Sequence, residues 1–282
     1  MSAESDSSFQ ARKLSFSLTF HNLESPYDTM SVFLLPKEVL QIGVNRLAQG
    51  ESLVLTDTDG TRVSGTLWQV TAPERPGLYG LTVYRAQTDE TARINVFVLH
   101  PLSEVRDGKL NGYLIGAYPG VALSNLAIYK PPRGLLEVTR ENTDTWITPH
   151  YKLGQFVCKQ AGNYPRYLIL RTALLLKLEF LTEQAVAAGY ASRPFHIMSG
   201  YRTPYYNRAI GNGTYSRHIW GGAVDIFIDE NPADGLMDDL NGDGKVDVGD
   251  ARVLYDFVES FYSKPEYKDF IGGLGVYTET SN

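Results

Sequence analysis

Six short runs rich in β-branched and aromatic residues lie between residues 12 and 101, and they constrain the fold more than any other feature. Turn signals such as Asp59-Gly60 separate these runs. Runs of this kind with turn residues between them are typical of strands. About six or seven strands in roughly 90 residues favour an all-β sandwich of immunoglobulin type. The runs are LSFSLTF, MSVFLLP, SLVLTD, GTLWQVTA, GLYGLTVYRA and ARINVFVLHP.

After residue 101 the pattern changes, which predicts a chain of several domains. Residues 102–149 are rich in glycine and proline and contain several aromatic residues, as expected for a connector. Residues 150–282 mix helical and strand patterns without a regular repeat, which favours an α+β domain. We expect helices over 171–190, with Gly189 as its stop, and over 251–262, and short strands over 194–199 and 224–228. Residues 1–11 are a polar tail, and residues 12–101 are the sandwich.

Composition excludes several function classes. The 282 residues carry a net charge of −6, which argues against a nucleic-acid partner and against adhesion to an anionic membrane. Cys158 is the single cysteine, so an internal disulfide is excluded, and a buried packing role is favoured over a thiol nucleophile. No run of 18 apolar residues predicts a transmembrane segment. The N-terminal sequence MSAESDSSFQARK is polar and is not a signal peptide, so either the protein is cytosolic or its signal was removed.

The segment from Ser199 to Asp225 carries the first chemical motif. It contains SGYRT and then Ser216, His218 and Asp225 in the pattern S-x-H-x-x-G-x-A-x-D. A histidine and an aspartate seven residues apart, separated by glycines, can converge on one divalent metal. Zinc binds both ligand types, and a catalytic zinc site needs three protein ligands and one open position. This segment therefore predicts two of the three ligands.

The same segment resembles the zinc D-Ala-D-Ala carboxypeptidase and murein endopeptidase family, whose catalytic fold is shared with the Hedgehog signalling domain. The resemblance covers roughly residues 150–277 and includes PHYKLGQFVCKQ upstream and GGLGVY downstream. It implies that His218 and Asp225 are zinc ligands and that Arg202 stabilises the oxyanion formed during peptide hydrolysis. It also implies that Ser216 contacts the substrate or orients the loop that carries His218. Small residues at Gly221, Gly222 and Ala223 then leave room for loop, metal and substrate.

The family's third ligand, a histidine shortly after the GGLGVY segment, is not found in this sequence. Three explanations stay open: the chain is a piece of a longer polypeptide, which we favour; it is a degenerate, non-catalytic relative; or another group completes the site. His196 precedes SGYRT and could approach the site. Structural or surface roles are favoured for the remaining histidines and for His196 alike, and Glu279 is not assigned as the general base. The other histidines are His21, His100 and His150.

A second motif spans residues 239–250 and has the spacing of an EF-hand calcium loop. Gly244 stands at the sixth position, where such a loop turns sharply. Aspartate replaces glutamate at the twelfth position, as in dockerin loops, which this one resembles. We expect calcium to stabilise this insertion, at about residues 229–262, within the peptidase-like domain. The predicted calcium ligands are Asp239, Asn241, Asp243, the carbonyl of Lys245, Asp247 and Asp250.

Together these features predict a zinc metallopeptidase that hydrolyses peptidoglycan stem peptides or cross-links, with catalytic zinc and structural calcium. The alternative is a non-catalytic envelope protein that uses the same fold to bind peptidoglycan or another partner. The resemblance implies a periplasmic or cell-surface location. Neither the specificity for D,D or L,D bonds nor the oligomeric state follows from the sequence.

Overall fold

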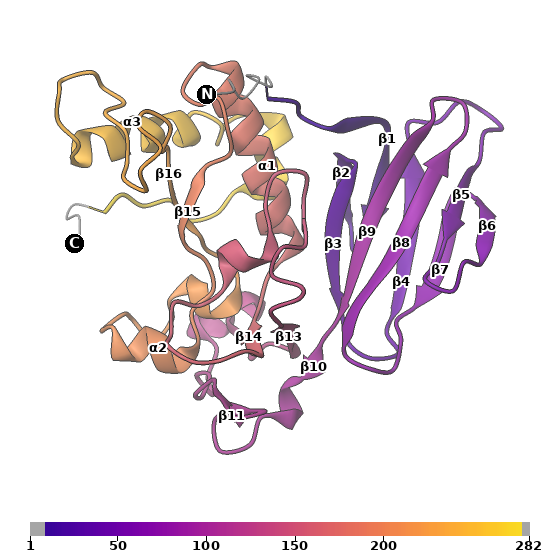
Figure 1. Ribbon diagram of the computed structural model, residues 1–282, viewed down its shortest axis with the longest axis horizontal. Coiled ribbons are helices and arrows are strands. Elements are labelled where there is room, and N and C mark those ends of the chain that lie inside the picture. Colours follow the sequence, from indigo (N-terminus) through magenta and orange to yellow (C-terminus); the bar gives the residue numbers. More distant parts are fainter. Residues whose placement is uncertain (1–8, 278–282) are drawn as a thin grey trace, which may run out of the picture. The chain divides into compact units, whose positions relative to one another are not determined.

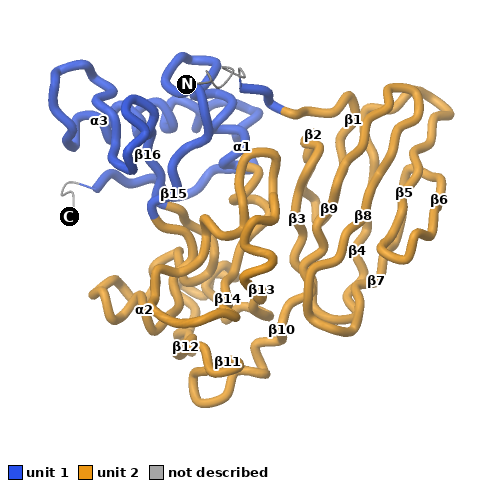
Figure 2. Tube along the Cα trace, viewed as in Figure 1, with its two compact units in different colours: residues 1–11, 177–198, 225–282 blue, residues 12–176, 199–224 orange. Residues whose placement is uncertain are grey.

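The computed structural model describes residues 9–277, and its contacts divide the chain into two units (Figure 2). Unit 2 comprises residues 12–176 and 199–224, and unit 1 comprises residues 1–11, 177–198 and 225–282. The division therefore runs through the expected peptidase-like domain. It also joins the expected sandwich and connector in unit 2. The predicted tail lies mostly outside the described residues, as does Glu279.

The all-β region of unit 2 is built from two sheets that hold strands β1 to β9 (Figure 1). One sheet has the order β2-β1-β4-β7 with antiparallel pairs. The other has the order β3-β9-β8-β5-β6, in which the β3–β9 pair is parallel and the other pairs are antiparallel. The first sheet contains β1 (Lys13–Phe20), β2 (Leu23–Tyr27), β4 (Val39–Asn45) and β7 (Leu67–Thr71). The second contains β3 (Thr29–Leu34), β5 (Leu53–Thr56), β6 (Arg62–Gly65), β8 (Gly77–Arg85) and β9 (Glu90–Val98).

Alternating burial explains why these runs form strands. In β4, Leu40 and Ile42 are buried while Val39 and Gln41 are exposed. Successive side chains of a strand point to opposite faces, so one face of the sheet forms a core and the other meets solvent. The prediction of an all-β first region is confirmed. The immunoglobulin-type topology stays a prediction.

Some strands were missed because their sequences lack the usual signals. Strand β2 contains Pro26, which cannot donate a backbone hydrogen bond, and it lies at the edge of its sheet, where proline is tolerated. Strand β6 is also an edge strand and has the polar sequence RVSG. The short length and polar character of an edge strand limit unwanted pairing with other chains, and they also hide the strand from a search for apolar alternation.

Residues 100–170 contain short strands and a compact apolar cluster. Strands β10 (His100–Pro101), β13 (Gly134–Val138) and β14 (Arg166–Leu168) form an antiparallel sheet, and β11 (Lys109–Leu110) pairs with β12 (Tyr113–Leu114). The expected connector thus contributes β13 to a sheet that also contains residues 100–101 and 166–168. Side chains of β11, β12, β13 and β14, together with Ile115, form the cluster, whose buried members are Leu110, Tyr113, Ile115, Leu135 and Tyr167.

Unit 1 has its own hydrophobic core, to which two helices contribute side chains. Helix α1 (Thr172–Ala187) enters the unit at residue 177, and helix α3 (Val248–Glu259) follows the predicted calcium loop. The Phe180 ring packs edge-on against Phe261, with centroids 5.6 Å apart. The buried members of the cluster are Leu181, Ala185, Ala191, Phe195, Ile228, Leu254, Val258, Phe261 and Tyr267.

The helix and strand predictions for residues 150–277 are confirmed, with shifted boundaries. Helix α1 ends before Gly189, whose positive φ of 78° suits a residue that terminates a helix. The predicted strands appear as β15 (His196–Ser199) and β16 (Asp225–Phe227), which pair with each other. Helix α3 begins three residues earlier than predicted. No helix among the described residues combines the length and apolar character needed to cross a membrane.

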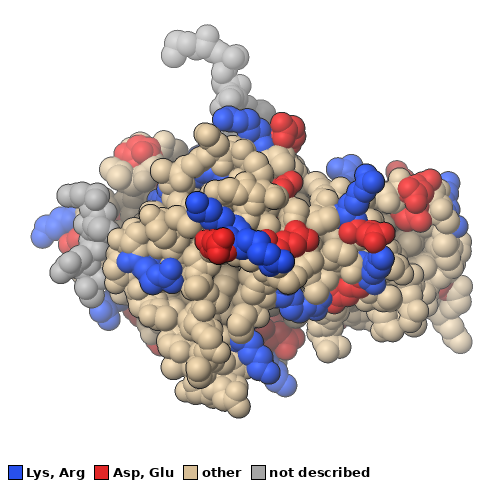
Figure 3. All heavy atoms as spheres, turned by 90° about the horizontal axis from the view of Figure 1, so that it is seen from below, with Lys and Arg blue, Asp and Glu red and all other residues tan. Residues whose placement is uncertain are grey.

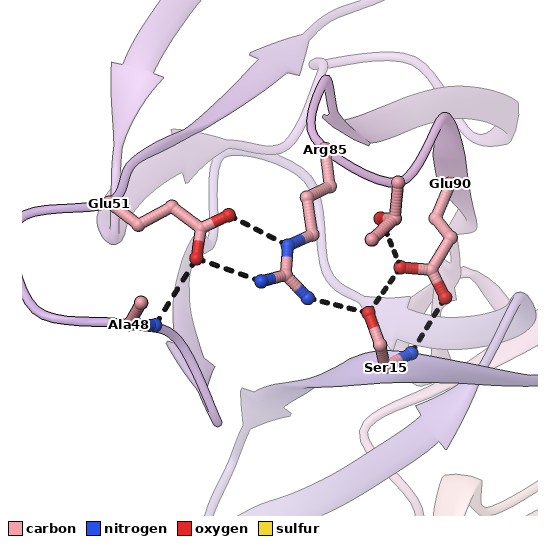
Figure 4. Close-up of polar contacts among 6 residues, drawn as sticks. Ser15, Ala48, Glu51, Arg85 and Glu90 are labelled. Atoms are coloured by element: carbon pink, nitrogen blue, oxygen red, sulfur yellow. Dashed lines mark hydrogen bonds and ion pairs between the residues drawn. The ribbon is translucent and has the colours of Figure 1, made fainter.

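Arg85 connects two carboxylates in the all-β region (Figure 4). Its Nε and Nη2 atoms donate to the two oxygens of Glu51 at 2.7 and 2.8 Å, and its Nη1 atom donates to Ser15 Oγ at 2.5 Å. Ser15 in turn donates its backbone N–H to Glu90 Oε1 at 2.7 Å. The hydrogen bonds from Arg85 lower the pKa of Glu51 below its ordinary value of 4.5. A bidentate pair of this kind fixes geometry as well as charge.

This pair predicts acid-sensitive stability. A carboxyl group whose pKa is lowered by folding contributes stability above its unfolded pKa of 4.5, and that stability is lost as the pH falls through the folded value. We expect Glu51→Gln to lower the melting temperature of the full chain at pH 7. The difference from wild type is expected to shrink as the pH falls below 4.5, because Glu51 itself then becomes neutral. Differential scanning calorimetry over a pH series measures both effects.

Glu74→Gln is the matched control. The ion pair between Lys37 Nζ and Glu74 Oε1 measures 2.8 Å, but both side chains are more than two-thirds exposed. Exposed ion pairs contribute little to stability, so this variant should have the same melting temperature as wild type at every pH. Equal melting temperatures for Glu51→Gln and wild type at pH 7 would contradict the role of the Arg85 network.

Candidate metal site

His218 lies in η5 (Arg217–Trp220), a short 3₁₀ helix of unit 2, and is buried. Its Nδ1 atom is 2.6 Å from the carbonyl oxygen of Gly200. A carbonyl oxygen only accepts hydrogen bonds, so Nδ1 carries the proton in the neutral ring and Nε2 keeps its lone pair. Metal-binding histidines are held in this way, with the second ring nitrogen bonded to a carbonyl or carboxylate. The residues around His218 therefore fit a metal bound at Nε2.

The Gly200 carbonyl is placed by a close backbone contact. A Cβ atom at Gly200 would come within 2.6 Å of Phe156 Cα, so the position requires glycine. Tyr201 N–H donates to the Phe156 carbonyl at 3.0 Å, which fixes the loop against η4 (Leu153–Phe156). The glycine of the SGYRT segment is thus explained by the structure, because the backbone of Gly200 contacts both Phe156 and His218.

Arg202 and Ser216 lie in the same unit as His218. Arg202 Nε donates to Ser199 Oγ at 3.0 Å, and its backbone N–H lies 3.4 Å from the His218 carbonyl. Ser216 is the residue before η5, and its carbonyl accepts from Ile219 N–H at 3.2 Å. The structure thus brings Arg202 next to the segment that carries His218. The predicted contacts of Arg202 and Ser216 with substrate stay predictions.

Close packing requires glycine at position 221, directly after η5. Gly221 ends η5 in the left-handed region with φ of 59°, and a Cβ atom there would overlap the Ile169 carbonyl. A Cβ atom at Gly222 would lie 2.5 Å from Arg217 Nη2. Glycine is therefore needed at position 221 by backbone packing within unit 2, independently of any substrate, whereas the neighbour of Gly222 is the far end of a side chain.

Asp225 lies at the start of β16 in unit 1 and accepts a hydrogen bond from Tyr277 Oη at 3.0 Å. The division between the units falls between Val224 and Asp225, so the two predicted zinc ligands belong to different units. Tyr277 is the last residue of the GGLGVY segment, and its contact with Asp225 is a feature that the motif search did not predict.

The histidines considered for the third position have other partners. His196 Nδ1 lies 3.3 Å from Asp229 Oδ2, and its ring stacks on Phe227 with centroids 4.5 Å apart. His100 Nδ1 lies 2.8 Å from Glu104 Oε2. Within residues 9–277, no three His, Cys, Asp or Glu side chains form a group that could hold a metal ion. A third zinc ligand is therefore not identified in this part of the chain.

The predicted calcium loop of unit 1 curls around its first residue. Asp239 Oδ1 accepts from the N–H groups of Gly242 and Asp243 at 2.7 and 3.2 Å, and Oδ2 accepts from Gly244 N–H at 2.8 Å. Gly244 has a φ of 83°, as the sharp turn at the sixth position requires. The side chains of Asn241 and Asp243 likewise accept from backbone N–H groups two residues ahead.

Asp250, at the twelfth position, joins this loop to α3. It is fully buried, and its oxygens accept from the N–H groups of Leu240, Asn241 and Asp247 at 2.8, 3.1 and 2.9 Å. Burial raises the pKa of Asp250, but the backbone donors outweigh this effect and leave the pKa lowered. Asp247 caps α3 by accepting from Gly249 N–H at 2.7 Å. The oxygen-rich residues fit calcium in chemistry, although they do not gather into a metal-binding group in this structure.

Cys158 takes the packing role predicted for it. Its side chain is 1% exposed, and burial raises the pKa of its thiol. A thiol with a raised pKa has little thiolate at neutral pH, and the thiolate is the reactive form.

Positive and negative side chains are mixed on one face of the protein. Figure 3 shows Lys and Arg side chains interspersed with Asp and Glu side chains on the face drawn there. The absence of a nucleic-acid partner stays a prediction from the net charge of −6.

Comparison with known proteins gives one family match. The model of the family described as Peptidase M15 matches residues 166–253, less than half of the chain. No match is found among curated proteins or among solved structures. The matched segment contains Arg202, Ser216, His218 and Asp225, and it ends within α3. Residues 166–253 of this chain are thus similar to a metallopeptidase family whose members are generally zinc-dependent.

Proposed function

We propose that this protein is a zinc-dependent peptidase that hydrolyses peptide bonds in peptidoglycan stem peptides or cross-links. The observation that carries the proposal is the 2.6 Å contact between His218 Nδ1 and the Gly200 carbonyl, because it places the ring proton on Nδ1, as in metal-binding histidines that use Nε2. The complete S-x-H-x-x-G-x-A-x-D pattern and the Peptidase M15 match to residues 166–253 support it.

His218 and Asp225 would hold the zinc ion. When bound, zinc polarises the scissile carbonyl and lowers the pKa of a coordinated water towards neutrality. The Gly200 carbonyl keeps the His218 ring in one tautomer and orientation. Arg202 would place its guanidinium against the negative charge that develops on the substrate oxygen, and Ser199 holds that guanidinium through Nε. Ser216 would contact the substrate beside His218.

The second candidate function is a non-catalytic envelope protein that binds peptidoglycan or another partner through the same fold. The specific observation in its favour is that, within residues 9–277, no three His, Cys, Asp or Glu side chains form a group that could hold a metal ion. In both cases the protein would act in the periplasm or at the cell surface. The two candidate functions predict different zinc contents and different hydrolytic activities, so zinc content and hydrolysis are measured on the same sample.

The deciding experiment is elemental mass spectrometry of the purified 282-residue chain, followed by incubation with peptidoglycan peptides. About one zinc per chain together with hydrolysis, as carboxypeptidase or endopeptidase of D,D or L,D type, supports the peptidase. Binding of peptidoglycan peptides without zinc and without hydrolysis supports the second candidate.

We predict that His218→Gln and Asp225→Ala each abolish zinc binding without unfolding the all-β region. Loss of an outer partner of a metal ligand typically costs about 10–100-fold in affinity, so loss of a ligand itself should exceed about 100-fold. Competition with a chromophoric chelator measures the affinity. His21→Gln is the control, because His21 is exposed in the turn between β1 and β2. If His218→Gln binds zinc as tightly as wild type, His218 is not a zinc ligand.

We also propose that calcium binds residues 239–250 and stabilises the insertion. Support comes from the spacing of the oxygen ligands, from the loop curled around Asp239, and from the direct continuation of the loop into α3. Because Asp250 contacts both the start of the loop and the start of α3, order in the loop is coupled to order in the helix.

We predict that calcium raises the melting temperature of the chain. A ligand that binds only the folded state adds about 2.7 kcal/mol at a concentration a hundredfold above its Kd. Asp243→Asn should reduce the shift, since it removes a charged ligand. Asp256 lies on the exposed side of α3, so the control variant Asp256→Asn should show the same calcium-induced shift as wild type. If millimolar calcium does not shift the wild-type melting temperature, the calcium assignment is wrong.

A further inference from the structure

Residues 118–131 form an irregular segment of unit 2, which we call the strap. It contains two single 3₁₀ turns, η2 (Leu123–Asn125) and η3 (Ala127–Tyr129). Ser124 and Asn125 both have positive φ, at 49° and 54°. Consecutive left-handed residues other than glycine are uncommon and persist where surrounding contacts hold them. The strap is therefore held in shape by its contacts with the rest of the unit.

Side chains on both sides of His218 donate hydrogen bonds to the strap. Tyr215 Oη donates to the Val121 carbonyl at 2.9 Å. Arg217 Nη1 donates to the Ile128 carbonyl at 2.8 Å. Trp220 Nε1 donates to the Lys130 carbonyl at 2.9 Å. The residues one before and two after His218 thus both contact the strap, which fixes the backbone of η5.

Ring contacts reinforce these hydrogen bonds. Trp220 is 1% exposed and lies edge-on to Tyr129, with centroids 5.2 Å apart. The Arg217 guanidinium lies 5.0 Å from the centre of the Tyr129 ring. A guanidinium over an aromatic ring is attracted by the ring's electron density, more strongly when it is partly removed from water. The side chains on both sides of His218 therefore pack against one aromatic residue of the strap.

The strap also contacts the loop that holds the His218 ring. Tyr118 and Tyr201 share a hydrogen bond of 2.8 Å between their hydroxyl oxygens. Tyr201 is 1% exposed, and burial raises its pKa, so its hydroxyl stays protonated. It directly follows Gly200, whose carbonyl accepts from His218 Nδ1. The strap thus contacts both segments whose spacing determines that hydrogen bond.

Arg171 connects the strap to η5 a second time. Its Nε atom donates to the Trp220 carbonyl at 3.0 Å, and its Nη2 atom donates to the Ile128 carbonyl at 3.2 Å. The Ile128 carbonyl therefore accepts from Arg171 and Arg217 together. Because both guanidinium groups donate to this carbonyl, the two cations lie close together, and burial and the charge of Arg217 lower the pKa of Arg171. Two like charges remain beside one carbonyl because the fold holds them there.

We propose that the strap is a positioning element for His218. By holding η5 and the Gly200–Tyr201 loop together, it keeps the His218 ring in the tautomer with Nδ1 protonated. The structural part of this inference stands on the contacts above, and its consequence for zinc rests on the proposed function. Tyr118, Trp220 and Arg217 are then positioning residues, since they act through His218.

The test is ¹⁵N NMR of the metal-free full chain labelled at histidine, which distinguishes the two neutral tautomers. The spectrum is recorded at about pH 8.5, well above the ordinary histidine pKa of about 6.5, and His218→Gln assigns the signal. Trp220→Phe removes the bond to Lys130 and keeps an aromatic ring. Tyr118→Phe removes the bond to Tyr201. Tyr215→Phe is a milder third variant if either of these fails to fold.

Trp68→Phe is the matched control. Trp68 is 5% exposed in β7 and donates from Nε1 to the Val63 carbonyl at 3.1 Å. Trp68→Phe therefore removes the same side-chain atoms as Trp220→Phe, and also one hydrogen bond to a carbonyl, but in the all-β region. We expect the strap variants to lower the Nδ1-protonated fraction of His218 and the control to leave it unchanged. Zinc binding should weaken about fivefold in each strap variant, the equilibrium effect of one ordinary hydrogen bond.

The outcomes separate the two proposals. If the strap variants have the same His218 tautomer as wild type and Trp68→Phe, the positioning role is overturned, whatever the zinc result. If wild type binds no zinc but the strap variants change the tautomer, the positioning role stands and the zinc peptidase fails. If the tautomer and the zinc affinity both change in the strap variants alone, both proposals are supported.

Discussion

The candidate site depends on one hydrogen bond, between His218 Nδ1 and the Gly200 carbonyl. It joins two segments 18 residues apart in the sequence, and it decides which nitrogen of the ring carries a proton. For the bond to form, Gly200 must lie against Phe156, and Gly221 must lie against the Ile169 carbonyl. Both contacts exclude a side chain. The glycines of the motif therefore serve backbone packing, and the chemistry of His218 depends on that packing.

Much of the fold could be predicted from local sequence. Helix α1 follows from its run of leucines and from Gly189, which lies just beyond its end, and the all-β region follows from alternating apolar residues. Strand β2 was missed because Pro26 weakens the strand pattern. The start of α3 was missed because Val248, Gly249 and Asp250 read as the end of a loop, while the side chains of Asp247 and Asp250 in fact cap the helix there. A cap depends on side-chain geometry, which spacing alone does not give.

The candidate site was predictable in its residue types but not in its arrangement. The motif identified Arg202, Ser216, His218 and Asp225, and the structure brings the first three into one unit. The contact of Tyr277 with Asp225 and the tautomer of His218 depend on residues far away in the chain. The aromatic residues of the strap gave a composition signal, but composition does not show which neighbours they contact. Long-range contacts of this kind follow from the fold as a whole.

The strap accepts its hydrogen bonds from Tyr215, Arg217 and Trp220 through main-chain oxygens. Every residue type supplies such an oxygen, so the side chains of Val121, Ile128 and Lys130 are free to diverge while the geometry is kept. The matched family segment begins at residue 166, after the strap. A chain trimmed to that segment would keep Arg202, Ser216, His218 and Asp225 and would lose the strap that contacts the segment around His218. The boundaries of sequence similarity therefore do not coincide with the boundaries of the structure that the site needs.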